Sequence, residues 1–174
     1  MSWHSVIAGL IILQRLAELA YSRRNIARLK AAGAIVVDEP GYILPGYYLI
    51  VAVHAAWALA LIFAIPADAP VDPVFLVLYG VILAGRVWVM ASLGWFWTTR
   101  IVTLPGAPLV RKGPYRFIRH PNYVVVAAEV AIAPLIFGAW GIALVFSVLN
   151  AAVLWPRIRA EEAALSDRRS AMAS

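Results

Sequence analysis

Residues 111–123 read RKGPYRFIRHPNY, and residues 124–155 after them form an apolar stretch in which Glu129 is the single ionisable side chain. A second charged segment, RIRAEEAAL, begins at Arg157. Gly138 and Gly141 lie near the middle of the apolar stretch, where glycine favours a turn. The pattern predicts a helical hairpin that returns the chain to its starting side and brings the two charged segments together.

The composition of the whole chain indicates a membrane protein. Of its 174 residues, 63% are hydrophobic and 14% are charged, and the mean hydropathy is +0.82. A soluble domain is much less apolar. Helices that cross about 30 Å of hydrocarbon need roughly 20 residues, and the segments that approach this length are 3–21, 46–65, 73–93 and the hairpin 124–155. We predict an all-α integral membrane protein with about five transmembrane helices, the last two forming a hairpin whose short arms tilt or re-enter.

Positive charge gathers on one predicted side of the membrane. Thirteen of the fifteen Lys and Arg residues fall in three predicted loops, at 23–30, 100–119 and 157–169, whereas the loop 66–72 carries only Asp68 and Asp72 as charges. The positive-inside rule then places the three basic loops and the C-terminus in the cytoplasm and the N-terminus outside. We attribute the net charge of +6 to this topology and to anionic lipids rather than to nucleic acid.

Several common types of site are excluded or disfavoured by the sequence. The chain has no cysteine, which excludes disulfides, thiolate metal sites and a cysteine nucleophile. Its histidines, His4, His54 and His120, are predicted at three different depths, so no metal site is expected. Neither GxGxxG nor GxxxxGK[ST] occurs, so a nucleotide-like ligand needs a different kind of site. The first segment has no basic residues before it, and we expect it to be retained rather than cleaved as a signal peptide.

Polar side chains within the predicted helices lie at a common depth. Counted at 1.5 Å per residue, they lie roughly 9–12 Å below the cytoplasmic surface, and they are Arg15, His54, Arg86, Glu129 and Asn150. Polar groups in hydrocarbon cost several kcal/mol unless they are paired or hydrated. The sequence therefore predicts an internal cavity in the cytoplasmic half.

Each member of this layer has a structural alternative. Glu18 lies one turn beyond Arg15 and could pair with it or, across helices, with Arg86. We interpret Arg15 and Glu18 foremost as an ion pair that fixes helix packing, and His54 foremost as an interhelical hydrogen-bonding residue. Arg86 needs an anionic partner, which is either a protein carboxylate or a ligand.

The segment between the third helix and the hairpin contains several prolines and glycines, which disfavour a long helix and predict an ordered loop. Tyr115, His120 and Tyr123 offer aromatic faces and hydrogen-bonding groups, and Gly113 permits close approach of backbone to a ligand. A ligand with an adenine, a ribose and a zwitterionic amino-acid tail suits this set. The alternative is a basic aromatic loop that lies on lipid headgroups.

The two charged segments and the hairpin between them resemble the isoprenylcysteine carboxyl methyltransferase family and related membrane phospholipid methyltransferases, over about residues 80–165. Arg86, Gly94 and Phe96 also look like the third-helix pattern of that family. Residues 14–19, 86–88, 91–94 and 120–126 are most similar to a bacterial branch associated with type III polyketide synthases. That branch is similar to enzymes that O-methylate alkylpyrones and alkylresorcinols.

The resemblance implies S-adenosylmethionine as the methyl donor. It assigns the cofactor pocket to Gly113, Tyr115, His120, Tyr123, Arg157 and Glu161, and the catalytic, acceptor-side roles to Arg86 and Glu162. It also implies one domain over residues 1–174, with three helices in 1–93 and the cofactor-binding loop, the hairpin and the start of the tail in 94–165. A bacterial inner membrane, with the site on its cytoplasmic side, is the expected location. Val125 replaces a glycine of many relatives, which would reshape the lipid entrance and disfavours a prenylcysteine substrate.

Methyl transfer from a sulfonium requires a positioned, nucleophilic oxygen and exclusion of water. Arg86 could hold a negatively charged oxygen in a site of low dielectric constant. A carboxylate or acidic 4-hydroxy-2-pyrone needs no base, whereas a phenol needs one, for which Glu162 is the predicted group.

The acceptor leaves alternatives open. A prenylcysteine carboxylate and phosphatidylethanolamine are the rivals within the same class. A non-catalytic membrane subunit or channel is the rival from another class. We expect a lipophilic substrate, the bilayer and a functional link to a type III polyketide synthase, with no nucleic acid and no metal.

Overall fold

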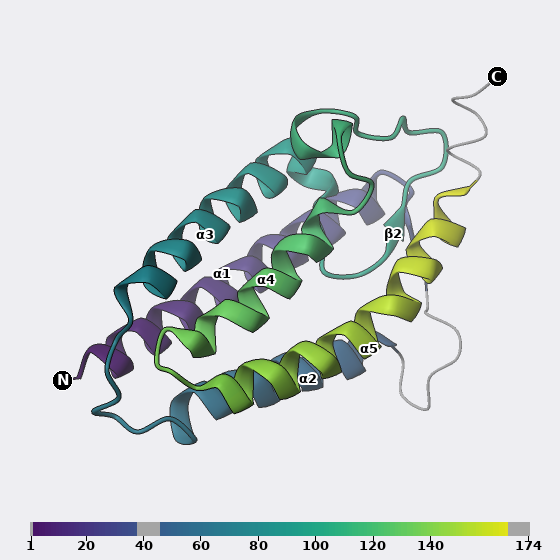
Figure 1. Cartoon of the computed structure of the whole chain (residues 1–174). Coiled ribbons are helices and arrows are strands. Elements are labelled where there is room, and N and C mark those ends of the chain that lie inside the picture. The colour runs from purple at the N-terminus through teal and green to yellow at the C-terminus, as the bar shows by residue number, and fades with distance from the viewer. Residues whose placement is uncertain (1, 38–45, 167–174) are drawn as a thin grey trace.

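The computed structural model of the chain describes residues 2–37 and 46–166, and within them it is a bundle of helices (Figure 1). The helices are α1 (Trp3–Ala31), α2 (Gly46–Phe63), α3 (Pro73–Leu93), α4 (Pro121–Leu135) and α5 (Trp140–Ala164). In this part of the chain, four helices are long and apolar enough to cross a membrane, and α4, with 15 residues, is shorter. The predicted all-α membrane fold is therefore confirmed, whereas only one of the two hairpin arms predicted to be short, α4, is short, because α5 has 25 residues.

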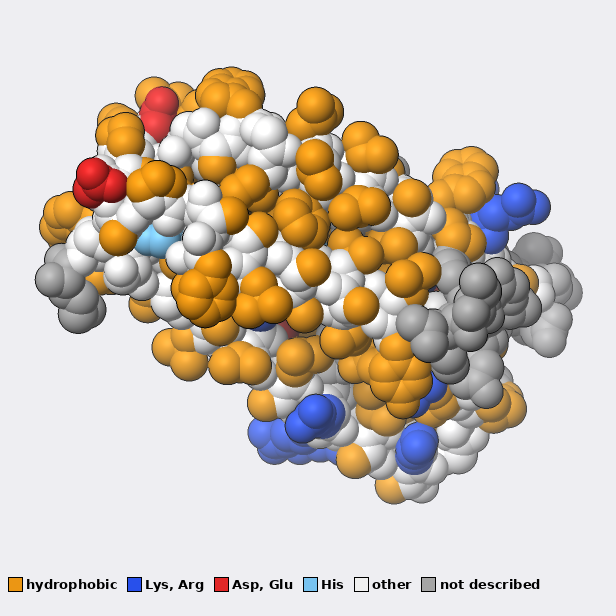
Figure 2. Space-filling model, turned by 90° about the horizontal axis from the view of Figure 1, so that it is seen from below, with side chains coloured by type: hydrophobic (Ala, Val, Ile, Leu, Met, Phe, Trp, Pro, Cys, Tyr) orange, Lys and Arg blue, Asp and Glu red, His pale blue; other side chains and the backbone are white. Residues whose placement is uncertain are grey.

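The two ends of the bundle differ in character. The start of α1, the connection between α2 and α3, and the α4–α5 turn lie at one end, which we name the turn end (Figure 1). Residues 94–120 and the last turns of α5 lie at the other, which we name the polar end. Acidic side chains occupy one end of the molecule and Lys and Arg side chains the other, with a largely apolar surface between them (Figure 2). Arg168 and Arg169 of the predicted basic tail lie outside the described residues.

The hydrophobic core sits towards the turn end. Helix α4 packs against α3 and α5, and α5 also runs beside α2. Ile11, Trp57, Tyr79 and Val130 bring α1, α2, α3 and α4 into one buried cluster. The indole Nε1 of Trp57 donates to the carbonyl oxygen of Val130 at 3.2 Å. This buried cluster fills the turn-end part of the bundle, and the cavity described below extends from the polar end to its edge at Trp57.

The hairpin turn forms where it is predicted. Helix α4 ends at Leu135 and α5 begins at Trp140, with Gly138 between them at a φ of +67°, a conformation that glycine adopts without strain. The carbonyl oxygen of Ile136 accepts from the amide of Asp72 at 2.8 Å, which ties the turn to the start of α3. Gly141, the second predicted turn glycine, lies inside α5 instead.

Two predicted helix ends are wrong, both at the polar end. Helix α1 continues beyond residue 21 to Ala31, and α5 continues beyond residue 155 to Ala164. Residues 22–31 contain no glycine or proline, so nothing in the chain stops the helix where the apolar stretch ends. The basic side chains at 23–30 therefore lie on a helix and not in a loop, and the charged tail segment is the last part of the hairpin's second arm.

The segment between α3 and α4 is ordered without a long helix, as predicted. It contains the 3₁₀ turns η1 (Gly94–Phe96) and η2 (Gly113–Arg116) and the short strand β2 (Val102–Thr103). β2 pairs antiparallel with β1 (Ile35–Val36), so that Ile35 lies opposite Thr103. The sequence did not predict this two-residue ladder, which ties the segment to the chain just after α1.

Candidate active site

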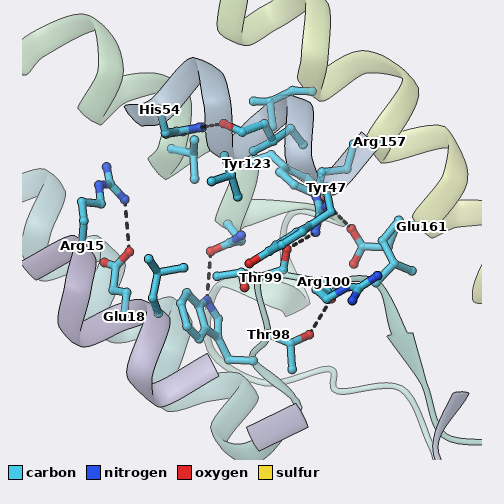
Figure 3. A pocket seen from close by; sticks show the side chains of 18 of the residues that line it. Arg15, Glu18, Tyr47, His54, Thr98, Thr99, Arg100, Tyr123, Arg157 and Glu161 are labelled. Carbon is cyan, nitrogen blue, oxygen red and sulfur yellow. Dashed lines mark hydrogen bonds and ion pairs between the residues drawn. The ribbon is translucent and has the colours of Figure 1, made fainter. Parts of the chain in front are cut away.

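A cavity of about 360 Å³ runs from the polar end into the bundle. This volume lies within the range of small-molecule sites, about 300–1,000 Å³. Its polar-end lining includes Thr98, Thr99, Arg100, Tyr115, His120, Tyr123, Arg157 and Glu161. Its deep lining includes Arg15, Glu18, His54 and Arg86. In Figure 3, Arg15 and Glu18 project from α1 on one side of the cavity, and Arg157 and Glu161 lie on the opposite side, on α5.

Tyr123, Arg157 and Glu161 form a hydrogen-bonded group at the polar end. The Tyr123 hydroxyl donates to Glu161 Oε2 at 2.5 Å and accepts from Arg157 Nε at 3.1 Å. Arg157 and Glu161 are four residues apart on α5 and so share one face of the helix. Arg157 Nη2 also donates to the carbonyl oxygen of Thr99 at 2.6 Å. These bonds join α4, α5 and the segment before β2, and they bring three of the predicted cofactor residues together.

His120 occupies the position before the first turn of α4. Its ring lies beside that of Tyr123, with 5.7 Å between ring centroids. Its Nδ1 lies 3.8 Å from Glu161 Oε2 and its Nε2 lies 3.3 Å from Glu162 Oε1. Glu161 lines the cavity, whereas Glu162 is not part of the lining and its carboxylate also lies 4.0 Å from Arg119 Nη1. Glu162 thus contacts His120 from outside the cavity, and its catalytic role stays a prediction.

Gly113 and Tyr115 belong to η2, but only Tyr115 lines the cavity. Gly113 has a φ of +56°, and a Cβ there would overlap Ser92 Oγ and lie 3.1 Å from Trp88 Nε1. The glycine therefore lets η2 pack against α3, and it shapes the cavity only through that packing. The Tyr115 hydroxyl is buried without a hydrogen-bond partner in the part of the chain that the structure describes.

Burial raises the pKa of Tyr115, with the nearby Glu161 carboxylate as a second cause, so the hydroxyl stays protonated at neutral pH. Buried hydroxyls in native structures nearly always have a hydrogen-bond partner. A hydroxyl that lines a cavity and has none is therefore suited to a polar group of a ligand.

Arg86 is held by carboxylates from two other helices. Its Nε donates to Glu129 Oε1 at 3.1 Å and its Nη2 donates to the second oxygen of the same carboxylate. Glu18 Oε1 lies 3.3 Å from Arg86 Nε. Arg86 Nη1 donates to Asn122 Oδ1 at 3.2 Å. Because Arg86 is 3% exposed and also lines the cavity, its guanidinium reaches the deep end already paired.

Arg15 completes the network from α1. Its Nη2 donates to Glu129 Oε2 at 2.7 Å and its Nη1 to Glu18 Oε2 at 3.1 Å. We name Arg15, Glu18, Arg86 and Glu129 the charged quartet. It holds two positive and two negative charges, so its net charge is zero. The sequence predicted that Glu18 pairs either with Arg15 or with Arg86, and in the structure it pairs with both. The anionic partner that Arg86 requires is therefore a protein carboxylate.

The other predicted members of the polar layer lie differently. His54 lines the deep cavity, but its Nδ1 bonds the carbonyl oxygen of Ile50 at 2.9 Å, one turn earlier in its own helix. The interhelical hydrogen bond predicted for His54 is therefore wrong. Asn150 is buried on α5 but is not part of the cavity lining. Counting residues from the predicted membrane edge gave its depth but not the direction of its side chain.

Asn122 and the residues that hold the roof of the cavity were missed by the sequence reasoning. Asn122 Oδ1 accepts from both Arg86 and, at 3.0 Å, Trp97 Nε1. Ser22 Oγ lies 2.8 Å from Thr99 Oγ1, and Asn25 Nδ2 donates to the carbonyl oxygen of Trp97 at 2.8 Å. Ser22 and Asn25 are small polar residues three positions apart on α1. This spacing was the sequence signal that α1 also contacts the segment that follows α3.

Apolar residues of α1 and α2 form one wall of the cavity, and they include Ile12, Leu16, Leu19, Ile50, Val51 and Ala55. Leu16 is 57% exposed and Val51 38% exposed on the molecular surface. The wall is therefore shared between the cavity and the apolar outer surface. Val125 lies elsewhere, because a Cβ on Gly85 of α3 would lie 3.9 Å from its Cγ2, and it packs between α3 and α4 without lining the cavity.

No metal site is found, since the described residues contain no group of three or more His, Cys, Asp or Glu side chains placed to hold an ion.

Comparisons with known proteins identify the family of the chain. The sequence profile of the isoprenylcysteine carboxyl methyltransferase (ICMT) family matches residues 74–167, which contain α3, the intervening segment, α4 and α5. The chain is also 36% identical over 171 residues to "Uncharacterized protein YpbQ" of Bacillus subtilis (strain 168), covering 96% of this chain and 98% of that protein. No solved structure matches the chain. The protein belongs to the isoprenylcysteine carboxyl methyltransferase family, a family of membrane methyltransferases.

Proposed function

We propose that the protein is an S-adenosylmethionine-dependent membrane O-methyltransferase whose acceptor is a lipophilic polyketide, foremost an alkylpyrone or alkylresorcinol. The observation that carries the proposal is the continuity of one cavity. It joins the polar group around His120 and Tyr123 to the charged quartet, and it shares an apolar wall with the outer surface. The polar end thus has room for the methyl donor, the deep end for the reacting headgroup, and the apolar wall for the alkyl chain.

The polar end fits the methyl donor. His120 and Tyr123 offer aromatic faces, Glu161 offers carboxylate oxygens for hydroxyl or ammonium groups, and Arg157 offers a cation near the rim. The buried hydroxyl of Tyr115, which lacks a partner in the described chain, offers a hydrogen bond to a polar atom of the donor. When bound there, the donor supplies an activated methyl group on a sulfonium.

The residues of this chain position and shield the acceptor. The α1–α2 wall holds the alkyl chain and leaves its remainder in lipid. At the deep end, Arg86 lies beside the acceptor oxygen and stabilises negative charge that develops there, while its own position is fixed by Glu129 and Asn122. The surrounding apolar side chains exclude water. Glu162 acts through His120 in this proposal, because it contacts His120 from outside the lining.

The balanced charged quartet favours a hydroxyl acceptor over the alternatives. The carboxylates of Glu18 and Glu129 balance the charge of the two arginines, so a prenylcysteine carboxylate or a phosphate group would meet no net positive charge here. A hydroxyl headgroup brings no net charge into this region and avoids that conflict. A type III polyketide synthase is the proposed source of such an acceptor.

We further propose a bacterial inner-membrane location with the polar end in the cytoplasm. The basic side chains of that end support this orientation by the positive-inside rule (Figure 2). It places the polar opening of the cavity in the compartment that holds soluble cofactors.

The proposal is tested first by donor binding and then by turnover. Purified protein in detergent is expected to bind S-adenosylhomocysteine in calorimetry, and His120→Ala is expected to weaken binding at least tenfold, about 1.4 kcal/mol. His4→Ala, at the turn end, is the matched control and should bind normally. Labelled methyl transfer is then measured to an alkylresorcinol, an alkylpyrone, a prenylcysteine and phosphatidylethanolamine. Absence of donor binding by the folded wild-type protein would favour a non-catalytic subunit or channel.

A further inference from the structure

His54 is the titratable residue of the deep cavity that the charged quartet does not engage. It lies on α2, above the α1 side chain Arg15 in the view of Figure 3, and it lines the same cavity. No described residue donates to it or accepts from it apart from Ile50. The family resemblance gives it no role, and the profile match begins only at residue 74.

The contact with Ile50 fixes which ring nitrogen carries hydrogen. A carbonyl oxygen can only accept, so the 2.9 Å contact requires hydrogen on Nδ1. In the neutral ring the other nitrogen, Nε2, then has a free lone pair. Nε2 has no hydrogen-bond partner among residues 2–37 and 46–166. The backbone of α2 therefore holds the ring as a hydrogen-bond acceptor in a cavity.

The carboxylates of the quartet already accept hydrogen bonds from other side chains. Glu129 accepts from both Arg15 and Arg86, and Glu18 accepts from Arg15 and from Gln14. Glu162, the base that the sequence predicted, is outside the lining. The charged groups that face His54 belong to the quartet: Arg15 and Arg86 disfavour a proton on the ring, and Glu129 favours it.

We propose that His54 Nε2 is the general base of the reaction and that the acceptor enters as a neutral, weakly acidic hydroxyl such as a phenol. The O–H bond breaks and its proton moves to Nε2. The oxygen lone pair forms the new O–CH₃ bond while the S–CH₃ bond of the sulfonium breaks and its electron pair stays on sulfur. Products are the methyl ether, a neutral thioether and an imidazolium that returns its proton to water. This assignment rests on the proposed O-methyltransferase function.

Two acceptors with the same alkyl chain test the base. His54→Gln retains an acceptor oxygen near the position of Nε2 but cannot hold the proton, and His54→Leu removes both properties. A positioned base contributes about 10²–10⁴-fold. We expect His54→Gln to lose at least roughly a hundredfold in kcat with an alkylresorcinol, with KM nearly unchanged, and less than about tenfold with the more acidic 4-hydroxy-2-pyrone. His54→Leu should in addition raise KM for the resorcinol.

The matched control is His4→Gln, since His4 is a buried histidine at the turn end whose Nε2 already bonds the carbonyl oxygen of Leu61 at 2.8 Å. It should leave the resorcinol-to-pyrone ratio at the wild-type value. Equal losses with both acceptors in His54→Gln, or a wild-type ratio, would overturn the assignment of the base.

A spectroscopic measurement separates this inference from the proposed function. In protein labelled with ¹⁵N-histidine, the His54 signals are identified by their loss in His54→Gln, and an alkylresorcinol is added with S-adenosylhomocysteine. Hydrogen bonding to Nε2 should move that nitrogen signal by several parts per million while His4 stays in place. If the wild-type protein methylates neither acceptor, the proposed polyketide acceptor is wrong. A shifted His54 signal would even then show that the resorcinol hydroxyl contacts Nε2. An unmoved signal with bound resorcinol refutes the role of His54 whatever the turnover.

Discussion

Replacement of Glu129 by glutamine should destabilise the fold, because this one side chain joins both arginines of the charged quartet. Glu129 is fully buried and receives Arg15 Nη2 at 2.7 Å as well as two nitrogens of Arg86. Glutamine has nearly the same volume, so no cavity forms and the effect is electrostatic. The quartet changes from two positive and two negative charges to two and one, which leaves a buried net charge of +1.

Breaking a buried ion pair by removing one partner costs about 3–5 kcal/mol. The lower end applies here, since Glu18 still contacts both arginines and the Arg15 side chain is 18% exposed. We therefore expect about 3 kcal/mol, or roughly 6–12 °C in Tm for a chain of this size. The assay is thermal unfolding in detergent, with monodisperse elution as the check on folding.

A double variant tests the charge argument itself. Arg15→Gln combined with Glu129→Gln leaves one positive and one negative charge, Arg86 with Glu18, and restores neutrality. We expect it to be more stable than the sum of the two single effects by at least about 1 kcal/mol. A Glu129→Gln protein that melts within about 2 °C of wild type, or strict additivity in the cycle, would show that the quartet's charge balance does not hold the bundle together.

Three further predictions concern the polar end and the topology. Gly113→Ala should destabilise by about 2–4 kcal/mol in thermal unfolding, because left-handed strain adds to overlap with α3; Gly106→Ala, with a φ of +76° and open space around it, should show the strain alone. Arg86→Lys should keep donor affinity within a few-fold but lose roughly a hundredfold in turnover, about 2.7 kcal/mol, and near-normal turnover would reduce Arg86 to a structural partner of Glu18. A reporter after Ser174 should read cytoplasmic and one at Asp68 external, and the reverse pattern would contradict the proposed orientation.

Much of the fold could be predicted because the bilayer imposes a length on apolar segments. The predicted segment 73–93 coincides with α3 (Pro73–Leu93), where Asp72 caps the first turn and Gly94 ends the helix. The segments 3–21 and 124–155 were right in position but short at the polar end. Hydropathy marks only the edge of the hydrocarbon. A helix ends where the conformational preference of the backbone changes, and α1 accordingly continues to Ala31, just before Gly33.

The site was predictable where one local pattern placed several residues, and not where contacts come from distant segments. The family resemblance assigned Arg157 and Glu161 to one site, and both contact Tyr123. The assignment of a polar layer brought Arg86 and Glu129 to the same depth, and they are paired. The resemblance gave Glu161 and Glu162 different roles, but the rotation of α5 about its axis decides which of two adjacent carboxylates enters the cavity, and only Glu161 lines it.

The charged quartet also bears on which acceptor the cavity can hold. Two unit charges 4 Å apart interact by about 4 kcal/mol at an effective dielectric constant of 20. A carboxylate headgroup beside the quartet would gain this from an arginine and lose a similar amount to Glu18 or Glu129, so the two contributions nearly cancel. Its desolvation, several kcal/mol for a buried ion, would then remain without compensation. A phenol loses far less hydration and can donate its hydrogen to His54, so the same charge balance that stabilises the bundle supports a neutral hydroxyl as the proposed acceptor.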